Sequence, residues 1–312
     1  MNRTRQRRWT TCVAAAVLAG AIGAGLAARE SGSQPAATPP PRASASEAAT
    51  YPPSELVRSC ESAGQALRKR LDDDFAILVR PPFVIAGNTT AGELEQMARW
   101  SVLRPAGAMW TSYFDKRPDK VITVLLFKGD KAYRWWAGTL FGDKDLPHFG
   151  YYRNVDRTLV MNIDTGTGTL VHELTHALIV YDYPDVPTWF NEGLASLHEQ
   201  CTVGEREITG LPNWRLPALQ AAIAKGALRS LRELVSARDF YGPGQGLNYA
   251  QARYFCLYVQ RAGKLPELYR HMRSAGRAAG ADVKAIEAAL GKPIQTVEKE
   301  MIELVKGLKF GR

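Results

Sequence analysis

Hydrophobic positions change their spacing along the chain, and this change divides the sequence into predicted elements. Residues 54–71 place apolar side chains at helical spacing and predict an amphipathic helix at the start of the folded part. The chain then alternates between short apolar runs and helical spacings. The predicted strands are 83–86, 121–127, 151–152 and 158–163, and the predicted helices between them are 91–103 and 131–141.

From residue 169 onward the spacing stays mostly helical, beginning with a segment at 169–180. Strands are therefore concentrated before this point and helices after it. The pattern predicts an α+β fold, with a small twisted, mostly N-terminal sheet packed on helices and a helical C-terminal half. We expect one folded domain over residues 54–312.

The first 28 residues have the layout of an export signal. Four arginines at positions 3, 5, 7 and 8 precede an apolar run over residues 12–28. This order predicts a secretory signal peptide, with a small-residue cleavage site at Ala27 and Ala28. The run is also near the lower length limit of a spanning helix, about 17 residues, so a single N-terminal membrane anchor is the alternative. Either interpretation predicts an exported protein, periplasmic or extracellular, or held at the inner membrane.

Residues 29–53 are rich in Pro, Ala and Ser and lack the apolar periodicity of a packed element. This composition predicts a semi-rigid linker between the signal segment and the domain.

Composition and charge exclude several classes of protein. Hydrophobic residues make up 46% of the 312 residues, enough for a packed core, so a disordered chain is excluded. The formal net charge of +9 falls to +5 without the four leading arginines, and no block of Lys and Arg or zinc finger is present. We therefore expect no nucleic-acid partner.

The pattern His-Glu-x-x-His occupies residues 172–176, inside the predicted helix 169–180. Residues four apart on a helix differ by about 40° around the axis and about 6 Å along it, so His172 and His176 can reach one tetrahedral Zn²⁺. Glu173 would then stand beside the metal, where a general base for a reacting water is needed.

A catalytic zinc site needs a third protein ligand. A third histidine on the same helix line would stand six residues after His176, but Asp182 occupies that position. The segment 186–195 predicts a second helix, and its Glu192 lies sixteen residues beyond His176. A chain that turns back between the helices could lay Glu192 against the first one. Two histidines, one glutamate and an open position for water are typical of a catalytic zinc site.

The zinc motif, together with the sequence Trp-Phe-Asn-Glu-Gly-Leu-Ala at 189–195, resembles the glutamate-zincin metallopeptidases, specifically the bacterial peptidase-MA-like domains. The resemblance covers roughly residues 80–300 and is most specific at the zinc motif. It implies a zincin-like fold and a zinc-dependent hydrolase that acts on polypeptides, with His172, His176 and Glu192 as ligands and Glu173 as the base. The aminopeptidase signature Gly-x-Met-Glu-Asn is absent, which favours an endopeptidase of the cell envelope.

The resemblance also implies roles for residues outside the zinc motif. Tyr249 would donate a hydrogen bond to the oxyanion, although a core aromatic side chain is the alternative. The strand 159–163 would border the cleft and pair with an extended peptide. Many relatives carry an acidic residue four positions after the glutamate ligand, where this chain has Ser196; Glu199 could take its place in orienting a histidine.

Two questions stay open from the sequence. A non-catalytic envelope binding module that keeps the zinc fold is the alternative to a peptidase, and Ser196 is the feature that favours it. Retention of Glu173 favours the enzyme, because metal binding alone does not require a glutamate there. The three cysteines beyond the signal segment, Cys60, Cys201 and Cys256, allow one disulfide and a free thiol, or a buried Cys256.

Overall fold

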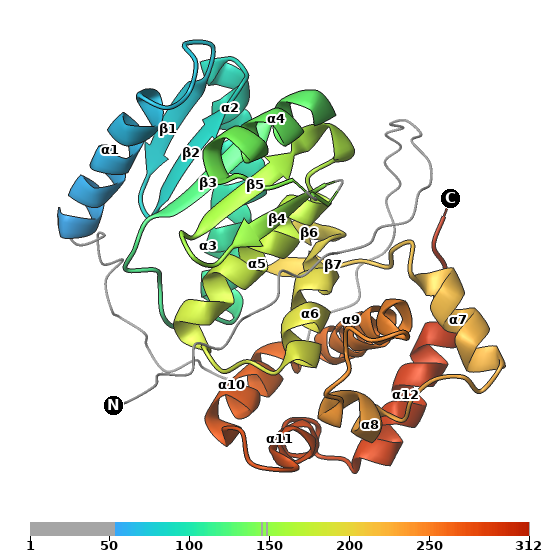
Figure 1. Ribbon diagram of the computed structural model, residues 1–312. Helices are drawn as coiled ribbons and strands as arrows, with labels where there is room; N and C mark the ends of the chain where they lie inside the picture. Colours follow the sequence, from blue (N-terminus) through green and yellow to red (C-terminus); the bar gives the residue numbers. More distant parts are fainter. Residues whose placement is uncertain (1–53, 145, 148, 312) are drawn as a thin grey trace, which may run out of the picture.

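The computed structural model describes residues 54–144, 146–147 and 149–311, and Figure 1 shows its elements in sequence colours. The predicted signal segment and linker lie outside the described residues. None of the helices within the described ranges is long and apolar enough to cross a membrane.

A five-stranded sheet forms the centre of the first half. Its order is β1-β2-β3-β5-β4; β2, β3 and β5 are parallel, and β1 and β4 run antiparallel at the two edges. The strands are β1 Ala76–Arg80, β2 Phe83–Gly87, β3 Ile122–Phe127, β4 Gly150–Arg153 and β5 Thr158–Asn162. Every residue of β2 and β5 is buried, as expected for central strands covered on both faces.

Helices cover both faces of the sheet (Figure 1). One face packs against α1 Ser54–Arg68 and α4 Asp130–Phe141, and alternate strand residues such as Val84 and Val160 point to it. The other face packs against the remaining helices of this half. They are α2 Ala91–Ala98, the π-helical turn η1 Arg99–Leu103, α3 Arg104–Ser112 and α5 Gly168–Asp182, which follows the 3-10 turn η2 Ile163–Thr165.

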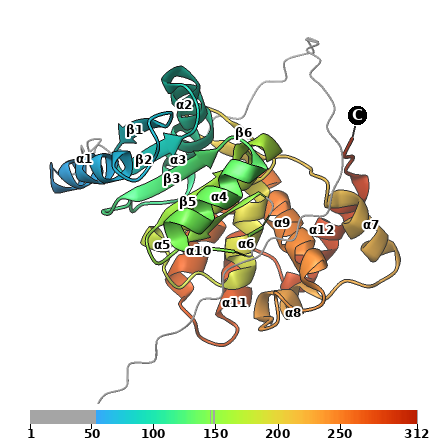
Figure 2. The ribbon, with the colours of Figure 1, turned by 45° about the horizontal axis from the view of Figure 1, so that its top comes forward.

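The second half is helical apart from one short hairpin, and it lies to one side of the sheet layers (Figures 1 and 2). Its helices are α6 Thr188–His198, α7 Leu216–Ala224, α8 Leu231–Ser236, α9 Gln245–Arg261, α10 Leu265–Ala275, α11 Ala281–Leu290 and α12 Ile294–Gly307. The hairpin consists of β6 Cys201–Val203 and β7 Ile208–Gly210. The apolar side chains of this half continue the core on the α5 side of the sheet.

Two glycines let helix α6 lie close to its neighbours. A Cβ on Gly193 would stand 2.9 Å from the carbonyl oxygen of Ala252, so glycine permits the tight contact between α6 and α9. A Cβ on Gly168, at the start of α5, would collide with the carbonyl oxygen of Glu199 just beyond the end of α6. The start of α5 and the end of α6 are therefore held in contact, which fixes how the two helices face each other.

The mixed class of helices and a small, mostly N-terminal sheet confirms the predicted α+β organisation. One expectation is wrong. The strand 159–163 cannot pair with a substrate, because β5 lies between β3 and β4 and both its edges already carry partners. Of the alternatives left open for the cysteines, the described residues show Cys60, Cys201 and Cys256 as free thiols, with Cys256 buried. Strands β1, β6 and β7 were not predicted.

Candidate metal centre

The motif histidines and the predicted glutamate ligand come together between α5 and α6. His172 and His176 lie one turn apart on α5, and Glu192 lies on α6; all three side chains are buried. The Nε2 atoms of the two histidines are 3.0 Å apart. Oε2 of Glu192 is 3.4 Å from each of these nitrogens. The three predicted ligand residues therefore present one atom each to a common point.

The spacing of these three atoms can be tested against zinc chemistry. Zinc bonds to histidine nitrogen and carboxylate oxygen are about 2.0–2.2 Å long, so tetrahedral ligand atoms stand about 3.3–3.6 Å from one another. The triangle here has edges of 3.0, 3.4 and 3.4 Å. A cation at its centre needs only small side-chain movements. The nitrogen and oxygen donors and their spacing thus fit a zinc ion.

Both histidines have a side-chain oxygen close to their second ring nitrogen. Nδ1 of His176 makes a 2.9 Å hydrogen bond to Oδ1 of Asn191, and Nδ1 of His172 lies at ion-pair distance, 3.1 Å, from Oε1 of Glu199 without hydrogen-bond geometry. An acceptor near Nδ1 favours a proton there and leaves the lone pair of Nε2 for a metal. Since His176 faces the start of α6 and His172 its end, the two helices cross the site in opposite directions.

Glu199 therefore takes the position beside a zinc-motif histidine that needs an acidic side chain, which Ser196 does not have. Seven residues are close to two helical turns, so Glu199 and Glu192 lie on the same side of α6. Ser196 instead contributes its backbone carbonyl oxygen, which accepts a 2.9 Å hydrogen bond from Nε of Arg253. The expectation that Glu199 stands beside a zinc-motif histidine agrees with the contact to His172.

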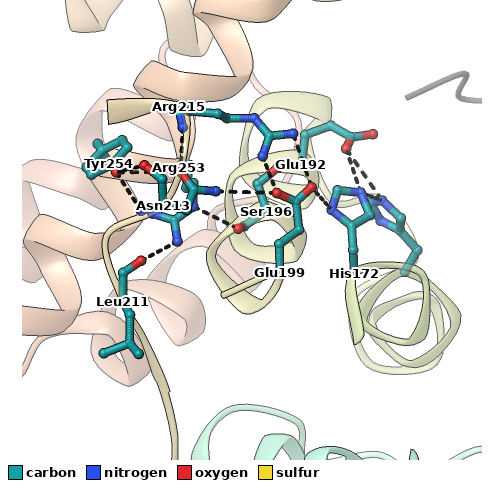
Figure 3. Close-up of polar contacts among 10 residues, drawn as sticks. His172, Glu192, Ser196, Glu199, Leu211, Asn213, Arg215, Arg253 and Tyr254 are labelled. Carbon is teal, nitrogen blue, oxygen red and sulfur yellow. Dashed lines mark hydrogen bonds and ion pairs between the residues drawn. The ribbon is translucent and has the colours of Figure 1, made fainter. Parts of the chain in front are cut away.

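A network of buried polar groups holds Glu199 in place (Figure 3). Arg215 donates from both terminal nitrogens to the Glu199 carboxylate, and its Nη2 lies 3.1 Å from Oε1. Asn213 accepts a 3.1 Å hydrogen bond from the backbone N–H of Arg215. The hydroxyl of Tyr254 in turn accepts a 2.9 Å hydrogen bond from the backbone N–H of Asn213. These bonds fix the loop before α7, and they thereby position the guanidinium of Arg215 that donates to Glu199.

The charges of the site reinforce one another. Burial opposes ionisation of Glu199, yet His172 and Arg215 hold the pKa of its carboxyl at about 2, so it is a carboxylate at neutral pH. Burial also works against charged Glu192, but the neighbouring histidines lower its pKa well below the usual value. A buried carboxylate, Glu192, and a partly buried one, Glu199, therefore flank His172. This negative surrounding favours a cation at the centre.

Glu173 is buried beside the histidines but does not belong to the triangle of ligand atoms. Burial raises the pKa of its carboxyl, while the histidines and the backbone N–H of Tyr152 lower it in part. A raised pKa brings a carboxylate closer to the range in which it takes and returns a proton. Tyr152 belongs to edge strand β4, so Glu173 stands between the ligands and that edge.

The two tyrosines near the site have different positions. Tyr249 is 7% exposed on α9, and its ring packs 5.3 Å from that of Phe240 and 6.4 Å from that of Tyr241. Tyr241 is 46% exposed, and its hydroxyl donates a 2.6 Å hydrogen bond to Oε1 of Glu192. The tyrosine in direct contact with a predicted ligand is therefore Tyr241, which the sequence did not identify.

Three contacts of the candidate site were not predicted from the sequence, and only one of them has a signal there. Asn191 precedes Glu192 in the second motif, and a polar residue beside a ligand is a reasonable candidate for a histidine partner. Arg215 and Tyr241 reach the site from loops 16 and 49 residues away from their partners. No local pattern marks either of them.

The sequence matches no model of a known protein family, and it has no match among curated proteins.

Proposed function

We propose that this chain is a zinc-dependent peptidase that hydrolyses peptide bonds, with a zincin-like arrangement of the α5–α6 helix pair. The observation that supports this most is the joint presence of three convergent ligand atoms and a separate buried carboxylate, Glu173, beside them. Zinc bound by His172, His176 and Glu192 would polarise a substrate carbonyl and make a water molecule more acidic.

The residues of the chain have separate tasks in this proposal. Glu173 accepts the proton of the attacking water and later returns it to the leaving amine. Asn191 and Glu199 keep the imidazoles turned toward the metal. Tyr249 remains the candidate oxyanion donor that the resemblance implies. Its burial in the core cluster, 7% exposed, favours the alternative of a packing residue.

A polypeptide substrate suits the edge of the sheet next to Glu173. The backbone N–H of Asn162 donates to the carbonyl oxygen of Phe149, so Tyr151 and Arg153 make the following ladder bonds to β5. The peptide groups of Gly150 and Tyr152 then face away from β5. Because the backbone N–H of Tyr152 already faces Glu173, an extended peptide would pair with this edge of β4 through the remaining outward groups, the N–H of Gly150 and the carbonyl oxygens of Gly150 and Tyr152. The edge of β4 thus replaces the strand 159–163 in the proposal.

The non-catalytic alternative loses the feature that favoured it. Ser196 suggested that no acidic side chain orients a histidine of the site. Glu199 lies 3.1 Å from Nδ1 of His172 and is gripped by Arg215, so an acidic partner is present. Glu173 is retained at the base position, where a purely structural zinc site has no use for it.

Two variants test the proposal. Wild type should bind one zinc per chain, and His176→Ala should lose it, whereas the exposed His271→Ala should not. Glu173→Gln keeps the ligands and the side-chain volume but cannot take a proton. We expect it to retain zinc while hydrolysis of a denatured protein substrate falls about 10²-fold or more. Absence of stoichiometric zinc in wild type, or a Glu173→Gln variant as fast as wild type, would reject the peptidase.

We also propose that the chain is exported, on the basis of residues 1–28. N-terminal sequencing of the protein from cell fractions distinguishes the two forms: a new terminus near Ala28 supports a signal peptide, and an intact Met1 in the membrane fraction supports an anchor. Full-length protein in the cytosol would contradict both.

A further inference from the structure

The two carboxylate oxygens of Glu192 have different surroundings. Oε1 accepts the 2.6 Å hydrogen bond from the hydroxyl of Tyr241. Oε2 accepts no hydrogen bond of good geometry from the described residues; its neighbours are Nε2 of His172 and of His176, each at 3.4 Å. Glu192 itself is fully buried. One oxygen is thus already engaged, and the other is turned toward the point where the histidines converge.

The different surroundings of the two oxygens decide how many atoms of Glu192 can bind a metal. A carboxylate can bind through one oxygen or through both, and the second mode uses a coordination position that a reacting water or substrate needs. A phenol hydroxyl that donates to Oε1 holds this oxygen on the far side of the carboxylate. An O–H···O⁻ bond of 2.6 Å is also among the stronger hydrogen bonds in proteins.

The segment that carries Tyr241 is built to hold the hydroxyl in place. The turn at residues 239–242 is closed by a 2.8 Å bond from the backbone N–H of Gly242 to the carbonyl oxygen of Asp239. The carboxylate of Asp239 is bound by both terminal nitrogens of Arg229, each at 2.8 Å. The buried Asn248 on α9 donates a 2.8 Å bond to the carbonyl oxygen of Phe240. The backbone on either side of the tyrosine is therefore anchored.

Ring packing completes the positioning. The ring of Tyr241 lies 5.5 Å from that of Phe240 and 6.4 Å from that of Tyr249, in edge-on and tilted arrangements that aromatic pairs prefer. One side of the tyrosine remains open, with 46% of the residue exposed. Tyr241 therefore lies between solvent and the buried side chain of Glu192.

We propose that Tyr241 is a positioning residue of the metal centre, whose hydroxyl holds Glu192 as a one-oxygen ligand and so keeps a coordination position open. This inference rests on the proposed zinc site and adds a residue that neither the motif nor the resemblance contains. Tyr241 acts through Glu192, so its loss should change the metal itself and not only the rate of hydrolysis.

The test compares two matched tyrosines. Tyr241→Phe removes the hydroxyl and keeps the ring. Tyr258→Phe removes an equivalent 2.6 Å bond, from Tyr258 to Glu300, that joins α9 to α12 away from the site. Zinc affinity is measured by competition with a chelator. Coordination is followed by the visible absorption of the Co²⁺-substituted protein, which weakens when a fifth ligand atom joins four.

We expect zinc affinity to fall about 10-fold to 100-fold in Tyr241→Phe, in the range found for partners of metal ligands. We also expect its Co²⁺ absorption to weaken as Oε1 becomes free to bind, while Tyr258→Phe matches wild type in both measurements. If wild type binds zinc and Tyr241→Phe has unchanged affinity and spectrum, the role of Tyr241 is wrong and the zinc site stands. If wild type binds no zinc, both proposals fall.

Discussion

Two buried carboxylates near helix α5 differ in how completely the protein satisfies them. Asp182, the last residue of α5, accepts hydrogen bonds from the backbone N–H groups of Asp115 and Lys116, at 3.1 and 2.8 Å. Its other oxygen accepts from the hydroxyl of Tyr269 at 2.8 Å and from Nη1 of Arg273 at 2.6 Å. Four donors from two parts of the chain, residues 115–116 and helix α10, surround one acidic side chain.

Glu192 has a hydrogen-bond donor at only one of its two oxygens. A buried carboxylate needs hydrogen-bond donors or an opposite charge. The protein supplies donors to both oxygens of Asp182 but to only one oxygen of Glu192. The first cluster is complete as folded and joins α5 to α10. At the second, the free oxygen of Glu192 faces His172 and His176, which lower the pKa of its carboxyl, and we propose that these three residues share a cation. The oxygen without a hydrogen-bond donor, and not burial of charge as such, is what separates this candidate site from the Asp182 cluster.

Removing Asp182 should have the largest effect on folding. Asp182→Ala leaves two backbone N–H groups and the buried hydroxyl of Tyr269 without their acceptor, and Arg273 keeps only Asp115, which predicts a loss of about 3–5 kcal/mol in the free energy of unfolding. Urea denaturation measures this, with the exposed Asp185→Ala as the control. A loss below about 1 kcal/mol would remove the distinction between the two carboxylates.

Zinc should supply the missing compensation at the other cluster. At a free zinc concentration 100 times the dissociation constant, ligand binding stabilises the folded state by about 2.7 kcal/mol. We expect a corresponding rise in the thermal midpoint of wild type that a chelator reverses. His172→Ala should show no such rise. An equal rise in that variant would place the zinc elsewhere.

Glu199→Gln should weaken the metal centre without removing a ligand. The amide keeps the shape of the side chain but loses the charge that faces His172 and Arg215. We expect zinc affinity to fall about 10-fold to 100-fold, as measured by chelator competition. Glu205→Gln, at an exposed position, is the control and should bind zinc as wild type does.

The smallest effect is expected at the other histidine. Asn191→Ala removes an uncharged acceptor from Nδ1 of His176, and such a hydrogen bond contributes about 0.5–1.5 kcal/mol. Zinc affinity should therefore fall about 10-fold or less, in the same competition measurement. A loss greater than that of Glu199→Gln would show that Asn191, and not the charged partner, dominates the orientation of the ligands.

The parts of the site that sequence could predict are those fixed by helical periodicity. His172 and His176 converge because they are four apart, and Glu199 faces the same way as Glu192 because seven residues make about two turns. Such relations hold inside one helix and need no knowledge of the fold. The strands could also be predicted from local sequence, because continuous apolar runs at 83–86 and 121–127 are typical of buried segments.

The order of the strands could not be predicted in the same way. The inner position of β5 follows from two crossover connections and from β4 folding back onto its outer side. Arg215 and Tyr241 were missed because their contacts depend on how loops before α7 and α9 return to the site. Asp182 was considered only as a failed metal ligand. Its four donors become apparent only when α3, α5 and α10 are packed together.

The opposed crossing of α5 and α6 has a consequence for how the spacing of this motif can vary. His176 is served by the residue just before Glu192, and His172 by the residue seven after it. A residue inserted between Glu192 and Glu199 would turn Glu199 by about 100° and carry its carboxylate off the shared face. Spacings of four and seven keep the acid in phase with the ligand, whereas five and six do not. The helical phase relative to Glu192, rather than a fixed position in the sequence, therefore decides where an orienting acid can stand.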